Sequence, residues 1–203
     1  MGEAPELMFP NIRSAVPSDE AFLREMLYES LYVPQGSAPF ERNVVNLPEI
    51  AKYVDSWGRA GDLGFIAVDP TTNQPIGAVW MRLFTEAQKG YGYVAEDVPE
   101  LGIALLPEYR GRGIGSILLR RALEIAGLSY RAVSLSVSAE NPARRLYERF
   151  GFQLVGTSEN VVTMMKRLNQ PGVVRLVQAS DDDEAWLELL RRDAYRELRT
   201  SCP

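Results

Sequence analysis

Residues 101–116 read LGIALLPEYRGRGIGS, and this stretch decides the fold. Leu101 to Leu106 is a short apolar run that ends at Pro107, a pattern that predicts a buried strand. From Ile114 to Gly127 the apolar residues recur at helical spacing, which predicts a helix. The chain is therefore expected to pass from a strand into a helix through a glycine-rich turn.

The turn between the two elements has the chemistry of an anion site. A strand-to-helix turn directs several backbone N–H groups, and the positive end of the helix dipole, at one spot. Gly111, Gly113 and Gly115 allow positive φ angles and a close approach of a ligand to the backbone. Arg110 and Arg112 add positive charge. The stretch predicts a site for an anion such as a pyrophosphate, although a ligand-free turn is the competing interpretation.

Two familiar phosphate loops do not match this turn. A P-loop requires G-x-x-x-x-G-K-[ST], and no such string occurs in the chain. The dinucleotide fingerprint requires G-x-G-x-x-G, but the residue three positions after Gly115 is Leu118. The spacing present is instead R-x-x-G-x-G.

That spacing, with the strand and Pro107 before it, resembles the coenzyme A loop of the GNAT superfamily of N-acetyltransferases. A second stretch, from Asn141 to Phe152, resembles the family signature N-P-x-x-x-x-Y-E-x-x-G-F. The resemblance covers Asn11 to Leu168. It implies a mixed α/β domain whose largely antiparallel sheet is flanked by helices. The sheet should splay beside the 101–106 strand, with acetyl-CoA in the gap.

The resemblance also implies which residues bind acetyl-CoA, the co-substrate. The backbone of Ile103, Ala104 and Leu105 would bind the pantetheine arm as an added strand does. The pyrophosphate loop would comprise Arg110, Gly111, Arg112, Gly113, Ile114, Gly115 and Ser116. Asn141 would contact the cofactor, but it precedes Tyr147 by six residues where many members have seven. One residue fewer rotates a helix position by about 100°. No metal is implied.

The candidates for acid–base chemistry are few, because the chain contains no histidine. A base must then be a carboxylate, a tyrosine or a positioned water. Glu100 precedes the central strand, where a number of family members carry a glutamate that acts through water, and Glu96 and Asp97 are alternatives. The alternative interpretation is that Glu100 is a solvated carboxylate at the end of the strand, with no catalytic role. Tyr147 matches the family's general acid.

The acceptor is expected to be an amine, either a small molecule or a peptide. Glu86, Glu96, Asp97 and Glu100 lie in or beside the 85–99 loop, which predicts an acidic lining and a cationic acceptor. Because the first two helices of the family and their connection line the acceptor site, the resemblance makes Phe40, Tyr53 and Trp57 candidates for the acceptor pocket, with core packing as the alternative and favoured role of each. The resemblance implies an N-acetyltransferase with direct attack in a ternary complex. A non-catalytic acyl-CoA-binding module is the alternative.

Composition limits the other classes of function. The chain has 203 residues, 46% of them hydrophobic, and a net charge of −5, which argues against nucleic-acid binding. Cys202 is the only cysteine, so we expect no disulfide framework and a cytoplasmic location. No apolar run reaches membrane-spanning length, so no membrane partner is expected.

The remaining elements follow from periodicity and turn residues. Strands are expected at 11–16, 64–68, 76–84, 131–137, 153–156 and 161–168, and helices after Pro17, at 47–57 and at 141–150. The N-acetyltransferase domain would thus span 11–168. Residues 169–203 are expected to form a strand–helix extension, interpreted as a homodimer contact or as the stub of a duplicated domain.

Overall fold

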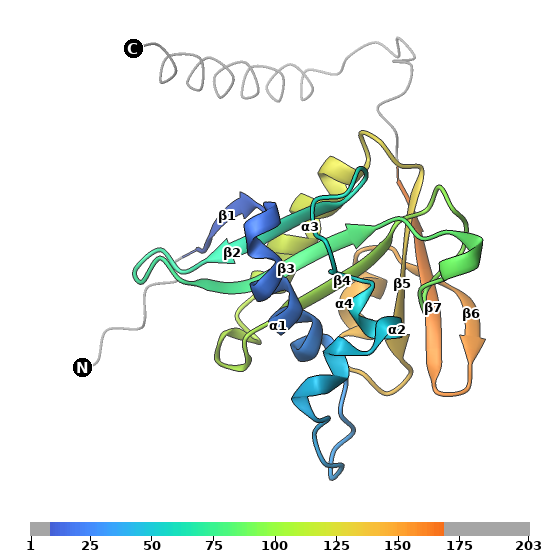
Figure 1. Cartoon of the computed structure of the whole chain (residues 1–203), viewed down its shortest axis with the longest axis horizontal. Coiled ribbons are helices and arrows are strands. Elements are labelled where there is room, and N and C mark those ends of the chain that lie inside the picture. The colour runs from blue at the N-terminus through green and yellow to red at the C-terminus, as the bar shows by residue number, and fades with distance from the viewer. Residues whose placement is uncertain (1–8, 169–203) are drawn as a thin grey trace. The chain divides into compact units, whose positions relative to one another are not determined.

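The computed structural model describes residues 9–168, which form a mixed α/β domain around one seven-stranded sheet (Figure 1). The strand order is β1-β2-β3-β4-β5-β7-β6, and every neighbouring pair is antiparallel except β4 and β5. The strands are β1 Asn11–Ser14, β2 Leu63–Val68, β3 Pro75–Arg82, β4 Glu100–Leu105, β5 Ala132–Ser138, β6 Gln153–Ser158 and β7 Val161–Arg167. The expected fold class is confirmed. The predicted extension at 169–203 lies outside the described residues.

Helices cover both faces of the sheet. They are α1 Glu20–Ser30, α2 Pro48–Ala51, α3 Ile114–Ala126 and α4 Arg144–Arg149, with short 3₁₀ turns η1 Pro17–Asp19, η2 Arg42–Asn46, η3 Glu86–Gln88 and η4 Pro107–Tyr109. Side chains alternate along β2, so that Phe65 joins the core under α3 while Ile66 joins the core under α1. Burial on both faces explains why β2 and β3 are almost continuously apolar.

The sheet parts between β4 and β5, as expected from the sequence. The two strands share a single register pair, Glu100 with Ser134, and the Ser134 N–H donates to Pro99 O at 3.0 Å. Along its opposite edge, β5 pairs with β7 over its whole length. The rest of β4 therefore has a paired edge on β3 and an open edge toward the gap.

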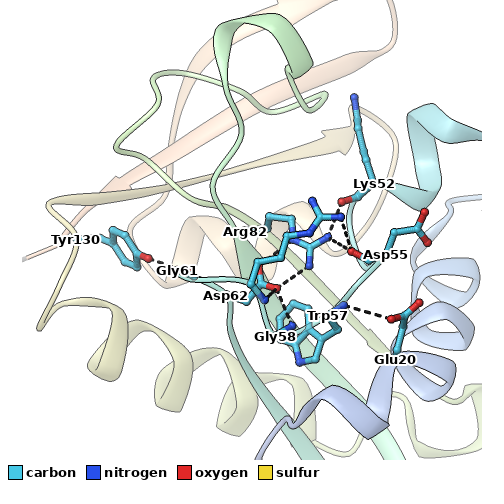
Figure 2. Close-up of polar contacts among 10 residues, drawn as sticks. Glu20, Lys52, Asp55, Trp57, Gly58, Gly61, Asp62, Arg82 and Tyr130 are labelled. Carbon is cyan, nitrogen blue, oxygen red and sulfur yellow. Dashed lines mark hydrogen bonds and ion pairs between the residues drawn. The ribbon is translucent and has the colours of Figure 1, made fainter.

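The prediction of a helix over 47–57 is wrong beyond Ala51. The Arg82 guanidinium, 2% exposed, donates from Nη1 to Lys52 O at 2.7 Å and to Asp55 O at 2.9 Å, as Figure 2 shows. These two carbonyls accept hydrogen bonds from Arg82 and not from the backbone N–H groups that would continue the helix. The chain then turns at Ser56, where φ is +52°. A buried cation from β3 has overridden local helix propensity.

The short helix expected at 141–150 is also trimmed at its start. The Arg144 and Arg145 N–H groups bond the carbonyls of Asn141 and Pro142, three residues back, which makes a tight turn rather than an α-helix. The α-helical residues begin at Arg144.

Removing the Arg82 side chain should destabilise the domain strongly. Arg82 also binds Asp62 through two bonds of 2.8 Å and 2.6 Å, and both side chains are only 3% exposed. Arg82→Met leaves a buried carboxylate unpaired, so we expect a loss of about 3–5 kcal/mol in the free energy of unfolding, measured with urea.

The control is Arg144→Met, which removes a surface pair with Glu148. It should cost only about 0.3–0.5 kcal/mol. Equal losses in the two variants would contradict the role of the buried Arg82 network.

Candidate active site

The glycine-rich turn adopts backbone angles that side chains disfavour. Gly111 and Gly113 have φ of +75° and +82°, and a Cβ at either position would have no atom within 4 Å. Glycine is therefore needed for conformation and not for lack of space. Gly113 is the N-cap of α3, and the first N–H groups of any helix lack intrahelical acceptors. The turn presents these donors to its open side.

Arg110 anchors the turn to two other elements. Its Nη2 donates to Glu29 Oε2 at 2.7 Å, and its Nε donates to Leu105 O at 3.0 Å. The turn is thereby tied to the ends of α1 and β4. The side chains of Arg112 and Ile114 do not anchor the turn in this way. The Arg112 guanidinium carbon lies 5.4 Å from the centroid of the Tyr109 ring, and Ile114 is buried in the core.

Along β4, alternate backbone groups face the gap. The Leu106 N–H donates to Ile76 O on β3, whereas Leu105 O points the other way and accepts from Arg110. Backbone direction alternates along a strand. The N–H and C=O of Ile103 consequently face the open edge, where an extended ligand could pair with them.

A first cavity of about 990 Å³ lies along the turn and this open edge. Its lining includes most of the residues expected to bind the cofactor, namely Ile103, Ala104, Leu105, Arg110, Gly111, Gly113, Gly115, Ser116 and Asn141, together with Tyr147. Arg112 and Ile114 line neither this cavity nor the second one described below. Their contribution to an anion site would come from the backbone alone.

A second cavity of about 440 Å³ opens where β4 and β5 diverge. Glu100 to Ile103 of β4 and Ser136 to Ser138 of β5 form its two sides. The two cavities share Ile103, Asn141 and Tyr147 among their lining residues. A molecule in one could therefore meet a molecule in the other beside Tyr147.

Glu100 is a buried carboxylate, only 2% exposed, at the inner end of the second cavity. Its Oε1 accepts from the Tyr53 hydroxyl at 2.8 Å, the Gly92 N–H at 2.8 Å and the Ser136 hydroxyl at 3.3 Å. Its Oε2 has no partner among residues 9–168. Burial raises the pKa of Glu100 above its ordinary value.

The 85–99 loop closes over Glu100 at two glycines. A Cβ at Gly90 would lie 2.0 Å from Glu100 Oε2, and one at Gly92 would lie 2.5 Å from the Leu135 carbonyl carbon. The Tyr91 N–H between them donates to the Tyr53 hydroxyl at 2.6 Å. Sequence reasoning identified Glu100 but did not identify Gly92, Tyr53 and Ser136 as its partners.

Tyr147 points its hydroxyl into shared space instead of bonding it to the protein. The residue is 8% exposed, and its hydroxyl makes no hydrogen bond within the described part of the chain. Its ring packs edge-on against Phe152, with centroids 5.9 Å apart. Burial raises the pKa of Tyr147 to about 12, so the hydroxyl stays protonated at neutral pH.

Asn141 faces both cavities despite its unusual spacing from Tyr147. Its Oδ1 accepts from the Ala143 N–H at 2.9 Å, which stabilises the turn before α4. The side-chain amide N–H₂ remains for a ligand.

The expected acidic lining is wrong for three of its four carboxylates, since only Glu100 lines a cavity. Glu86, Glu96 and Asp97 are exposed and line neither cavity. Glu86 pairs with Lys89, and Glu96 accepts from the Glu86 N–H, so these contacts hold them on the loop's outer side. Of the aromatic candidates, Phe40 and Tyr53 line the second cavity, whereas Trp57 lies against Arg82.

Within residues 9–168, no cluster of three or more His, Cys, Asp or Glu side chains is arranged to hold a metal ion. None of the helices described is both long and apolar enough to cross a membrane.

Gly92→Ala should destabilise the domain by about 1–3 kcal/mol, because the added methyl collides with the β5 backbone. Gly156→Ala is the matched control, since its Cβ would meet Thr163 at an ordinary 3.6 Å, and it should change the free energy of unfolding by less than about 0.5 kcal/mol. Denaturant titration measures both. Equal stability of Gly92→Ala and wild type would refute the close packing of loop 85–99.

Comparison with known proteins places this architecture in a family. A curated relative from Bacillus subtilis (strain 168), to which ribosomal protein bS18-alanine N-acetyltransferase activity is ascribed, is 40% identical over 76 residues. That match covers 36% of this chain and 50% of the relative, so the chain spans about half the length of the curated relative it matches.

The solved structures share the fold at low identity. A GNAT superfamily phosphinothricin acetyltransferase from Sinorhizobium meliloti, in complex with AcCoA, has a TM-score of 0.57 at 21% identity, covering 87% of this chain and 97% of its own. PaiA N-acetyltransferase from Thermoplasma acidophilum, in complex with coenzyme A, has a TM-score of 0.55 at 21% identity, covering 79% and 99%. The family model described as the Acetyltransferase (GNAT) family matches residues 23–152, well over half of the chain. The chain therefore belongs to the acetyltransferase (GNAT) family.

Proposed function

We propose that the protein transfers the acetyl group of acetyl-CoA to a primary amine by direct attack in a ternary complex. One observation carries this proposal: two cavities, one along the glycine-rich turn and one lined by the buried Glu100 carboxylate, share Tyr147 in their lining. Family membership and relatives crystallised with AcCoA or coenzyme A support the choice of co-substrate.

The first cavity has the properties that acetyl-CoA requires. Its volume of about 990 Å³ is at the upper end of the range for ligand pockets. The backbone N–H groups of 111–115 would bind the pyrophosphate, and the free edge of β4 at Ile103 would pair with the amide groups of the pantetheine arm. Asn141 would contribute its side-chain amide.

The second cavity would hold the amine. An ammonium has no lone pair for attack, so it must lose a proton, and Glu100 is proposed as the base, directly or through a water. The amine nitrogen then bonds the thioester carbon and releases its remaining excess proton to water, and the carbon–sulfur bond breaks. Tyr147 would supply the proton that the departing thiolate takes up. A phenol with a pKa of about 12 is protonated and ready for this role at neutral pH.

A non-catalytic acyl-CoA-binding module is the alternative function. Release of free thiol from acetyl-CoA in the presence of a panel of amines separates the two. Amine-dependent thiol release supports the transferase, whereas acetyl-CoA binding with no release from any amine supports the binding module.

Tyr147→Phe should lower kcat by about 10²–10⁴-fold, the usual range for a general acid. Affinity for acetyl-CoA should stay the same, because the hydroxyl matters only as charge develops on the sulfur. Steady-state kinetics and calorimetry measure the two quantities.

The matched control is Tyr130→Phe, which removes a hydroxyl that bonds Gly61 O at 2.9 Å, outside both cavities. It should keep wild-type kcat. Full activity of Tyr147→Phe would exclude Tyr147 from the chemistry.

Activity should depend on pH through Glu100. A base must be ionised, and burial raises the pKa of Glu100 above its ordinary value of 4.5, so kcat/KM should fall as pH falls through that raised pKa. Glu100→Gln should lower kcat/KM at neutral pH by about 10²–10⁴-fold and abolish this acid limb.

Glu96→Gln changes an exposed carboxylate of the same loop region and should keep the wild-type profile. An unchanged acid limb in Glu100→Gln would assign the base to another group.

A further inference from the structure

The second cavity contains two buried polar atoms that the protein leaves unpaired. Glu100 Oε2 and Trp80 Nε1 have no hydrogen-bond partner among the described residues, and their side chains are 2% and 1% exposed. Both residues line the cavity. Folded proteins pair nearly all buried polar groups, so an exception calls for an explanation. One of these atoms accepts a hydrogen bond and the other donates one.

The two atoms belong to neighbouring positions on one face of the sheet. Trp80 on β3 lies opposite Gly102 on β4, and a Cβ on Gly102 would lie 2.4 Å from the indole Cε2 and 2.8 Å from Nε1. The indole therefore covers Gly102. Glu100 is two residues away along β4 on the same face, at a Cα spacing of about 6.6 Å. Both residues line the second cavity, so one small ligand bound there could contact both side chains.

The charge of the cavity limits the ligand. Among the described residues that line it, Glu100 is the only Asp, Glu, Lys or Arg. It can match one ammonium group. A second ammonium, as in a polyamine, would have no anion, and a free carboxylate would have no cation and would face Glu100.

The outer part of the cavity is suited to an apolar substituent. Leu27, Leu31, Phe40, Val44, Ile50 and Tyr91 contribute to its lining from α1, the 31–41 segment, η2, α2 and the 85–99 loop. The acceptor thus needs one ammonium, one neutral hydrogen-bond acceptor close to it, and an apolar side chain.

We propose that the acceptor is an α-amino amide with an apolar side chain, its ammonium bound to Glu100 Oε2 and its carbonyl oxygen accepting from Trp80 Nε1. This inference rests on the proposed function, because it names the amine that the transferase acetylates. In such a molecule three bonds separate the nitrogen from the carbonyl oxygen, which suits two protein groups that lie on one face of the neighbouring strands β3 and β4. A free amide and the first residue of a peptide share this chemistry.

The test compares five amines of matched or contrasting chemistry in the full chain. They are L-phenylalaninamide, 2-phenylethylamine, which lacks the carbonyl, L-phenylalanine, which adds a carboxylate, spermidine, which adds ammonium groups, and a tripeptide amide that begins with phenylalanine. We expect the highest kcat/KM for L-phenylalaninamide or for the tripeptide, and the better of these two identifies the source of the amide. A preference for spermidine or L-phenylalanine would overturn the proposal.

The variant that isolates the indole is Trp80→Phe, which keeps a ring and removes the N–H. It should lower kcat/KM for L-phenylalaninamide by about tenfold, the effect of one lost hydrogen bond, and change that for 2-phenylethylamine less than about twofold. Trp57→Phe is the control, since Trp57 lines neither cavity, and it should affect the two amines equally. Equal losses for both amines in Trp80→Phe would contradict the bond to Nε1.

Calorimetric titration of the same amines makes the inference independent of turnover. If no amine is acetylated but L-phenylalaninamide binds wild type more tightly than Trp80→Phe, the proposed transferase function fails and the assignment of the cavity stands. If amines are acetylated without any dependence on Trp80 in kinetics or binding, the transferase stands and this inference is overturned.

Discussion

The single register pair between β4 and β5 is the constraint on which the rest of the site depends. Glu100 and Ser134 form the one register pair between these strands within the described residues, whereas the opposite edge of β5 pairs with β7 from residue 132 to residue 138. The open edge of β4 and both cavities follow from this divergence. A continuous ladder between β4 and β5 would close the edge and remove the second cavity.

Burying Glu100 at the point of divergence is costly, and three distant segments compensate for it. Tyr53, Gly92 and Ser136 all bond the same oxygen, Oε1. Arg82 supports this arrangement indirectly. Its guanidinium donates to the carbonyls of Lys52 and Asp55, which lie on either side of the 53–54 segment. The ion pair in Figure 2 is therefore connected to the site through the backbone that carries Tyr53.

The features predicted well from sequence are those set by local chemistry. The strand, the turn of positive-φ glycines and the helix over 101–126 each follow from residues close together in the chain. The helix at 47–57 was predicted wrongly because a distant side chain, Arg82, decides its end. The acidic lining was predicted wrongly because a count of carboxylates in a loop does not give the direction in which they point.

The sequence did not indicate Trp80 as a site residue, because a tryptophan within an apolar strand has the pattern of an ordinary core residue. The role proposed for it depends on the register that sets it opposite Gly102, 22 residues further along the chain, and such a register is not a local property. The partners of Glu100 were missed for the same reason, since Tyr53 after α2, Gly92 in the 85–99 loop and Ser136 on β5 meet Glu100 only in the folded domain.

The most direct test of the central claim is a crystal structure of the protein with acetyl-CoA bound. The account predicts the pyrophosphate on the N–H groups of 111–115, the pantetheine arm paired with the free edge of β4 at Ile103, and the thioester beside Tyr147, with its acetyl group directed toward Glu100. Acetyl-CoA bound away from the gap between β4 and β5, or a β4 edge closed by pairing with β5, would contradict it.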